Sequence, residues 1–164
     1  MNKQQAFQAL SQALKLEQQG RAFYLQAAEE TLDAKGKALF LSLADDEVKH
    51  AEMIQRQLHA LEGDGVYVLL PNLDVKPIDL GKELFPPERT KIDERIGVSP
   101  GEIDALHVAI DNEIQSYNLY KKAAQETTDE AGKQMYLWLA DAEVGHFNLL
   151  MSNYESLVSM GGWV

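Results

Sequence analysis

The chain contains one segment twice, at residues 13–50 and 109–146, aligned without a gap at a constant offset of 96 positions. Identical residues fill 18 of the 38 aligned positions, including Tyr24 and its counterpart Tyr120. Three metal-binding side chains also recur, Glu17 as Glu113, Glu47 as Glu143 and His50 as His146. The repeat therefore predicts two similar structural halves, each carrying one carboxylate and histidine half-site of a dinuclear metal centre.

The composition limits the metal sites and partners that are open to this chain. With 164 residues, 45% of them hydrophobic, we predict a single domain over residues 1–164. The chain has no cysteine, which excludes disulfides, iron–sulfur clusters and rubredoxin-type iron, and leaves oxygen and imidazole as metal ligands. The net charge of −11 argues against partners such as nucleic acid or an anionic membrane.

We expect a cytoplasmic protein with neither a membrane span nor a secretion signal. The sequence has no run of about 18 apolar residues, which is the length that crosses a bilayer. Residues 1–5 lack the apolar stretch of a signal peptide.

Apolar residues at three- and four-residue steps predict four helices. Turn residues from Asp33 to Gly36 separate the first two, Gly132 precedes the fourth, and Ser99 with Pro100 is a start signal for the third. The predicted helices span about residues 3–31, 37–62, 101–127 and 133–158. The predicted fold class is all-α, a four-helix bundle of two helical hairpins.

Residues 63–100 interrupt the helical pattern and hold all five prolines of the chain. A flexible tether between independent hairpins would leave an apolar face of each hairpin exposed. We therefore expect one long crossover between the second and third helices, in which residues 66–70 form a short strand or an extended segment packed on the bundle.

The candidate ligands lie in the apolar stripes of the predicted helices, so their side chains should point into the bundle. A Glu-x-x-His spacing puts the two side chains about 60° apart around the axis and roughly 4.5 Å apart along it, so that they can hold one ion together. The predicted metal ligands are Glu17, Glu47, His50, Glu113, Glu143 and His146.

Charge balance supports a pair of metal ions at these residues. Four buried carboxylates without a counter-charge would be strongly unfavourable, whereas two divalent ions neutralise them. Oxidation of both ions would leave an excess of positive charge that an oxygen-derived anion cancels. Mixed carboxylate and imidazole ligation suits iron or manganese best, and zinc also fits.

These motifs give the chain a resemblance to the ferritin-like diiron carboxylate superfamily, and within it to the rubrerythrins. The resemblance implies a ferritin-like bundle in which Glu47 and Glu143 bridge two iron ions. It further implies terminal ligation by Glu17 and Glu113, one nitrogen each from His50 and His146, a homodimer, and Tyr24 and Tyr120 close to the metals. A tyrosine there would hydrogen-bond a ligand or relay an electron, unless it serves only to pack the bundle.

The chain departs from typical rubrerythrins in two ways. Without cysteines it has no rubredoxin-like domain, so an external electron donor protein must supply electrons. Typical rubrerythrins carry an extra carboxylate three residues after the terminal glutamate ligand of the third helix, which corresponds to Glu113. In this chain that position is Ser116, and the equivalent position in the first copy is Gly20.

From the predicted metal site and the resemblance to rubrerythrins, we expect an oxidoreductase that reduces peroxide or dioxygen. The alternative is ferritin-like iron binding or storage without turnover.

Overall fold

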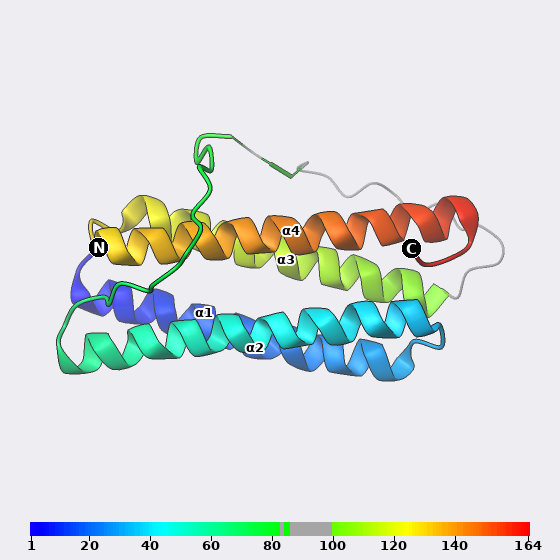
Figure 1. Ribbon diagram of the computed structural model, residues 1–164, viewed down its shortest axis with the longest axis horizontal. Coiled ribbons are helices and arrows are strands. Elements are labelled where there is room, and N and C mark those ends of the chain that lie inside the picture. The colour runs from blue at the N-terminus through cyan, green and yellow to red at the C-terminus, as the bar shows by residue number, and fades with distance from the viewer. Residues whose placement is uncertain (83, 86–99) are drawn as a thin grey trace.

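The computed structural model describes residues 1–82, 84–85 and 100–164, and in this part the chain forms four α-helices and no strand. Helices α1 and α2 form one antiparallel hairpin and α3 and α4 the other, and the hairpins meet mainly along α1 and α3 (Figure 1). The helices are α1 Lys3–Glu30, α2 Ala34–Gly63, α3 Pro100–Glu126 and α4 Glu130–Met160. This arrangement confirms the predicted all-α, ferritin-like four-helix bundle.

The second helix of each hairpin begins three residues earlier than predicted, at residue 34 instead of 37 and at residue 130 instead of 133. An aspartate starts each of them: the Asp33 side chain accepts hydrogen bonds from the first-turn amides of α2, and Asp129 does the same for α4. The prediction that Gly36 and Gly132 belong to the turns was therefore wrong. The cap expected at Ser99 lies outside the described residues.

Gly36 and Gly132 make room for aromatic rings. A Cβ atom on Gly36 would lie 2.5 Å from Cε2 of Trp163, and one on Gly132 would lie 3.0 Å from the ring of Tyr67. Both rings are buried, with Tyr67 8% and Trp163 6% exposed. The segment after α4 therefore folds back over the start of α2, and the segment after α2 packs against the start of α4.

The crossover begins as an extended segment packed on the bundle, without strand pairing. The Gln57 side chain donates to the carbonyl of Val68 at 2.7 Å and accepts from its amide at 2.9 Å. Further along, Lys76 pairs with Asp141 of α4 at 3.3 Å. Figure 1 shows this segment rising from the end of α2 across α4. The non-helical segment thus ties the two hairpins together.

Two apolar clusters fill the bundle, and the six predicted ligands lie between them. One cluster includes Leu10, Ile54 and Tyr136, and the other includes Phe40, Leu106 and Leu150. Within the described residues, no helix has the length and apolar character needed to cross a membrane. The clusters isolate the polar middle of the bundle from water at both ends.

Candidate metal centre

All six predicted ligands meet inside the bundle, where each is at most 8% exposed. Their ligand atoms form two groups, within each of which the atoms lie no more than 4.8 Å apart. One group is Glu17, Glu47, His50 and Glu143, and the other is Glu47, Glu113, Glu143 and His146. Glu47 and Glu143 belong to both groups, so the six side chains surround two adjacent candidate metal positions, the first beside His50 and the second beside His146.

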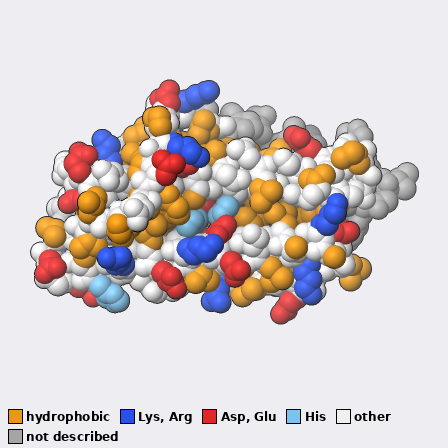
Figure 2. Space-filling view, in the orientation of Figure 1, with side chains coloured by type: hydrophobic (Ala, Val, Ile, Leu, Met, Phe, Trp, Pro, Cys, Tyr) orange, Lys and Arg blue, Asp and Glu red, His pale blue; other side chains and the backbone are white. Residues whose placement is uncertain are grey.

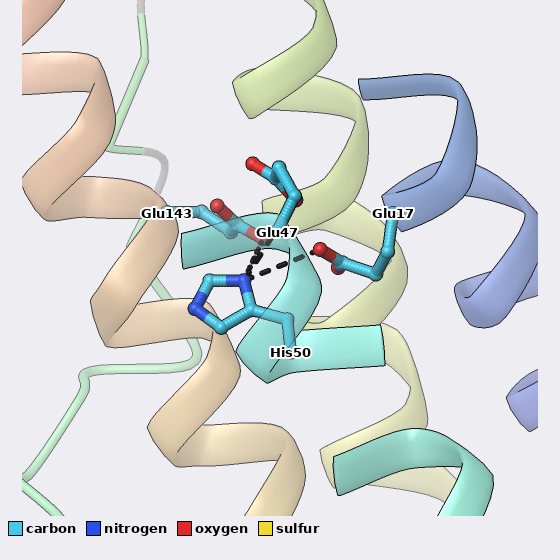
Figure 3. A group of neighbouring side chains, drawn as sticks. All are labelled: Glu17, Glu47, His50 and Glu143. Atoms are coloured by element: carbon cyan, nitrogen blue, oxygen red, sulfur yellow. Dashed lines mark hydrogen bonds and ion pairs between the residues drawn. The ribbon is translucent and has the colours of Figure 1, made fainter. Parts of the chain in front are cut away.

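His50 of α2 faces three carboxylates from three helices (Figure 3). Its Nδ1 lies 3.2 Å from Oε2 of Glu17, 3.7 Å from Oε1 of Glu143 and 3.9 Å from Oε2 of Glu47. Glu47 and His50 project together because they lie three residues apart on one helix. The Nδ1 atom is therefore the nitrogen that faces the first position.

His146 of α4 has matching surroundings at the second position. Its Nδ1 lies 3.1 Å from Oε2 of Glu143, 3.4 Å from Oε2 of Glu113 and 3.7 Å from Oε1 of Glu47. The rings of His50 and His146 are nearly parallel, with centroids 5.5 Å apart. The sequence repeat thus appears in space as a local twofold arrangement of the two half-sites.

Each repeated tyrosine contacts a glutamate of the opposite half. The hydroxyl of Tyr24 on α1 donates to Oε1 of Glu113 on α3, and that of Tyr120 on α3 donates to Oε1 of Glu17 on α1. Because each tyrosine occupies Oε1, the Oε2 atom of each glutamate is left facing a histidine. The tyrosines therefore contact two of the predicted ligands, Glu113 and Glu17.

Burial makes ionisation of three of the carboxyl groups unfavourable. Desolvation, with the nearby charge of Glu113, raises the pKa of Glu17 to about 7. Burial and the neighbouring carboxylates also raise the pKa values of Glu47 and Glu143 well above their usual range. A metal-free site therefore retains protons that bound cations would displace.

The remaining titratable groups respond to specific partners. Burial works against ionisation of Glu113, but the neighbouring His146 and Glu143 groups and the hydrogen bond from Tyr24 lower the pKa of Glu113 overall. Burial also opposes the charged form of His146, yet contact with Glu113 and other carboxylates raises the pKa of His146. Desolvation dominates at His50, and its pKa is lowered. The pKa values of the two histidines are therefore shifted in opposite directions in the metal-free site.

The donor atoms fit a pair of cations, because several of them are buried without a hydrogen-bond partner. Both carboxylate oxygens of Glu143 and Nδ1 of His146 lack such a partner among the described residues, although these groups lie only 3.1 Å apart. Buried acceptors without donors are rare in proteins and costly. Carboxylate and imidazole donors at this spacing suit iron, manganese or zinc.

A cavity of about 50 Å³ adjoins the site between α1 and α3. It is lined by Ser116, at the position of the extra carboxylate of typical rubrerythrins, by its counterpart Gly20, and by Glu47 and Glu113. A Cβ atom on Gly20 would lie 3.5 Å from Cδ of Glu47, which is an ordinary contact distance. The absence of that carboxylate therefore coincides with open space beside two of the predicted ligands.

Two neighbours of the histidines were not found from the sequence. Oδ2 of Asp46 lies 3.5 Å from Nε2 of His146, and the Trp138 ring meets His50 edge-on with centroids 5.6 Å apart. Asp46 directly precedes Glu47, and its position in the second half is occupied by Ala142, so the difference between the copies was the available signal. Figure 2 shows histidine side chains at the surface between α2 and α4, beside charged groups.

Comparisons with known proteins identify a similar solved structure and a matching family. A solved structure described as a hypothetical protein from Pyrococcus furiosus is 26% identical, with a TM-score of 0.69 over 94% of this chain and 91% of that chain. No curated protein matches the chain. The rubrerythrin family model matches residues 8–154, which include most of each of the four helices and all six clustered residues. By this match, which confirms the resemblance seen in the sequence, the chain belongs to the rubrerythrin family.

Proposed function

We propose that this chain is an oxidoreductase that binds two iron ions and reduces peroxide or dioxygen with electrons from an external donor protein. The observation that carries the proposal is the pair of buried ligand groups that share Glu47 and Glu143. The proposed ligands are the six predicted ones, Glu17, Glu47, His50, Glu113, Glu143 and His146. When bound, the iron ions supply the electrons for reduction of an O–O bond.

The proposed ligand roles follow from which residues the two groups share. Glu47 and Glu143 belong to both groups, which supports a bridging role for these carboxylates. Glu17 with His50, and Glu113 with His146, belong to one group each, which supports terminal ligation. Fully ionised, the four carboxylates carry a charge of −4, and two divalent cations neutralise it.

The surrounding residues restrict what can react at this site. The apolar clusters on either side exclude water, and Tyr24 and Tyr120 fix the orientation of the capping glutamates. The adjoining cavity of about 50 Å³ holds a molecule of only a few atoms, since one water needs roughly 10–15 Å³ measured in this way. This size favours peroxide or dioxygen over a bulky organic substrate.

Stopped-flow oxidation of the diferrous protein tests the proposal. Anaerobic protein loaded with two ferrous ions is mixed with hydrogen peroxide and, separately, with dioxygen. We expect oxidation by at least one of them to be much faster than that of free ferrous ion, and we expect Glu47→Gln to abolish the advantage. Glu52→Gln changes an exposed glutamate of the same helix and serves as the matched control. Oxidation at the rate of free ferrous ion would refute the proposal.

Sedimentation and iron content separate this function from iron storage. A homodimer that takes up two iron ions per chain fits the enzyme. A large cage holding a mineral core fits storage instead, and would replace the proposal.

A further inference from the structure

The two halves of the site differ at the residue that lies behind each histidine. The six clustered residues are the same in both copies, but Asp46 of the first copy corresponds to Ala142 of the second. Trp138 of the second copy corresponds to Ser42 of the first. Both differences fall beside the imidazole rings, where they change what each ring contacts.

On one side of the site, an anchored carboxylate lies behind His146. Oδ2 of Asp46 is 3.5 Å from Nε2 of His146, while the Nδ1 atom on the opposite edge of that ring faces the ligand carboxylates. Oδ1 of Asp46 accepts a hydrogen bond from Lys49 at 2.6 Å, which holds the carboxylate in place. An acceptor in this position favours the tautomer that carries its proton on Nε2 and keeps the Nδ1 lone pair free.

On the other side, His50 has an apolar neighbour in place of a carboxylate. All of its ion contacts within the described residues are made through Nδ1, and residue 142, the counterpart of Asp46, is an alanine. The rings of His50 and Trp138 lie nearly perpendicular to each other, with centroids 5.6 Å apart. Among the described residues, no carboxylate comparable to Asp46 contacts the opposite edge of this ring.

We propose that Asp46 is a positioning residue for His146, and that the half-site of Glu113 and His146 binds a divalent metal more tightly than that of Glu17 and His50. The inference rests on the ligand set in the proposed function. A carboxylate that accepts the second N–H of a metal-binding imidazole fixes its orientation and raises its basicity, and loss of such a partner typically lowers metal affinity by about 10- to 100-fold. Within the part of the chain that the structure describes, such a partner lies beside His146 and not beside His50.

Metal titration of single half-sites tests the proposal. His50→Ala leaves the His146 half-site, and His146→Ala leaves the other. Affinity for Co²⁺ or Zn²⁺ is measured in both backgrounds against a competing chelator. We expect tighter binding in the His50→Ala protein, and a loss of about 10- to 100-fold on adding Asp46→Ala in that background only. Adding Ala142→Asp should strengthen binding in the His146→Ala background.

Two controls separate positioning from a general structural effect. Asp45→Ala removes an exposed carboxylate next to Asp46 and should change neither affinity. Asp46→Asn keeps an acceptor oxygen and should restore part of the affinity lost in Asp46→Ala. In the Zn²⁺-loaded protein with all six ligands, Asp46→Ala should also shift the Nε2–H resonance of His146 and leave that of His50 unchanged. This spectrum decides the question even if a half-site variant does not fold.

These binding measurements do not depend on catalytic turnover, because they use Co²⁺ and Zn²⁺ instead of iron. Equal affinities in the two backgrounds, an equal loss in both on removing Asp46, or an unchanged His146 resonance would each overturn the inference. A diferrous protein that reacts with neither oxidant would refute the proposed function and leave this result intact. Failure to bind any metal would refute both.

Discussion

Tyr24 on α1 donates a hydrogen bond to Glu113 on α3, so each half of the repeat orients a proposed ligand of the other half. The reciprocal bond runs from Tyr120 to Glu17. Because these bonds cross the contact between α1 and α3, they join the two hairpins at the height of the site. The tyrosines therefore connect packing of the bundle with the geometry of the proposed ligands.

Removing one of these hydroxyls should weaken metal binding without disrupting the fold. Tyr24→Phe leaves Oε1 of Glu113 buried without its donor, which costs about 1–3 kcal/mol. We expect a comparable loss in the urea-unfolding free energy of the metal-free protein, and about a tenfold loss of Co²⁺ affinity. Tyr117→Phe is the matched control, because the buried Tyr117 hydroxyl has no hydrogen-bond partner among the described residues. Equal behaviour of the two variants would contradict the assignment.

The metal-free protein should become less stable as the pH rises. The pKa of Glu17 is about 7 in the folded chain, against a usual value of 4.5, so the folded state binds more protons than the unfolded state between these values. The unfolding free energy therefore falls as the pH rises through this window, and the raised pKa values of Glu47 and Glu143 add to the decline.

Urea unfolding between about pH 5 and 8 with a chelator present measures this slope. Glu17→Gln removes one titrating group and should make the slope shallower. Saturating Zn²⁺ should reverse the slope, because metal binding requires the deprotonated ligands. A metal-free protein whose stability rises with pH across this range would disprove the prediction.

The contact between Gly36 and Trp163 should contribute several kcal/mol to stability. Trp163→Ala empties a buried site and should cost about 3–5 kcal/mol. Gly36→Ala places a methyl group 2.5 Å from the ring, so it should also destabilise the protein, but should cost less once Trp163 is alanine. Thermal unfolding of the two single variants and the double variant tests this coupling.

Gly145→Ala is the control for that experiment. Gly145 is an exposed residue within α4, and a Cβ atom there would meet nothing within 4 Å. This variant should stabilise the helix by about 0.5–1 kcal/mol. Additive costs for Gly36→Ala and Trp163→Ala would show that the two residues do not act through their contact.

Filling the cavity beside Glu47 should slow the entry of an oxidant. Ser116→Leu and Gly20→Leu each place a larger side chain in a space of about 50 Å³. We expect slower oxidation of the diferrous protein at an unchanged metal content, measured by stopped flow and metal analysis. Gly145→Leu, which points into open space, should leave the rate unchanged. Full rates in both filled variants would show that oxidants use another path.

The sequence was sufficient to predict the bundle and the cluster because both follow from periodicity. Glu47 and His50 lie three residues apart within an apolar stripe, which determines their shared face without knowledge of the fold. Repetition of the motif at Glu143 and His146 implied a second half-site. The helix ends were less accurate, since the sequence offers both Asp33 and Gly36 as turn residues and only packing reveals that Gly36 accommodates a ring.

The sequence patterns did not predict which side chains make contact between helices. Asp46 contacts a histidine on α4, 100 residues further along the chain, and its helical position alone indicates a partly exposed acid. The crossing of Tyr24 to Glu113 likewise depends on how α1 packs against α3. Periodicity specifies the face on which a side chain lies, but the partner on the next helix depends on how the helices pack.

The aromatic rings that pack against Gly36 and Gly132 extend the internal symmetry beyond the helices. Tyr67 and Trp163 are separated by the same 96 positions as the rest of the repeat, and each covers the glycine of the opposite hairpin. They also meet equivalent residues edge-on, Tyr67 against Tyr136 and Trp163 against Phe40. A single hairpin would therefore lack the aromatic segment that covers its glycine, because that segment belongs to the other hairpin. The chain thus resembles a dimer of hairpins that exchange these aromatic segments and are joined into one polypeptide. Two fragments divided within the crossover should therefore reassemble as a heterodimer.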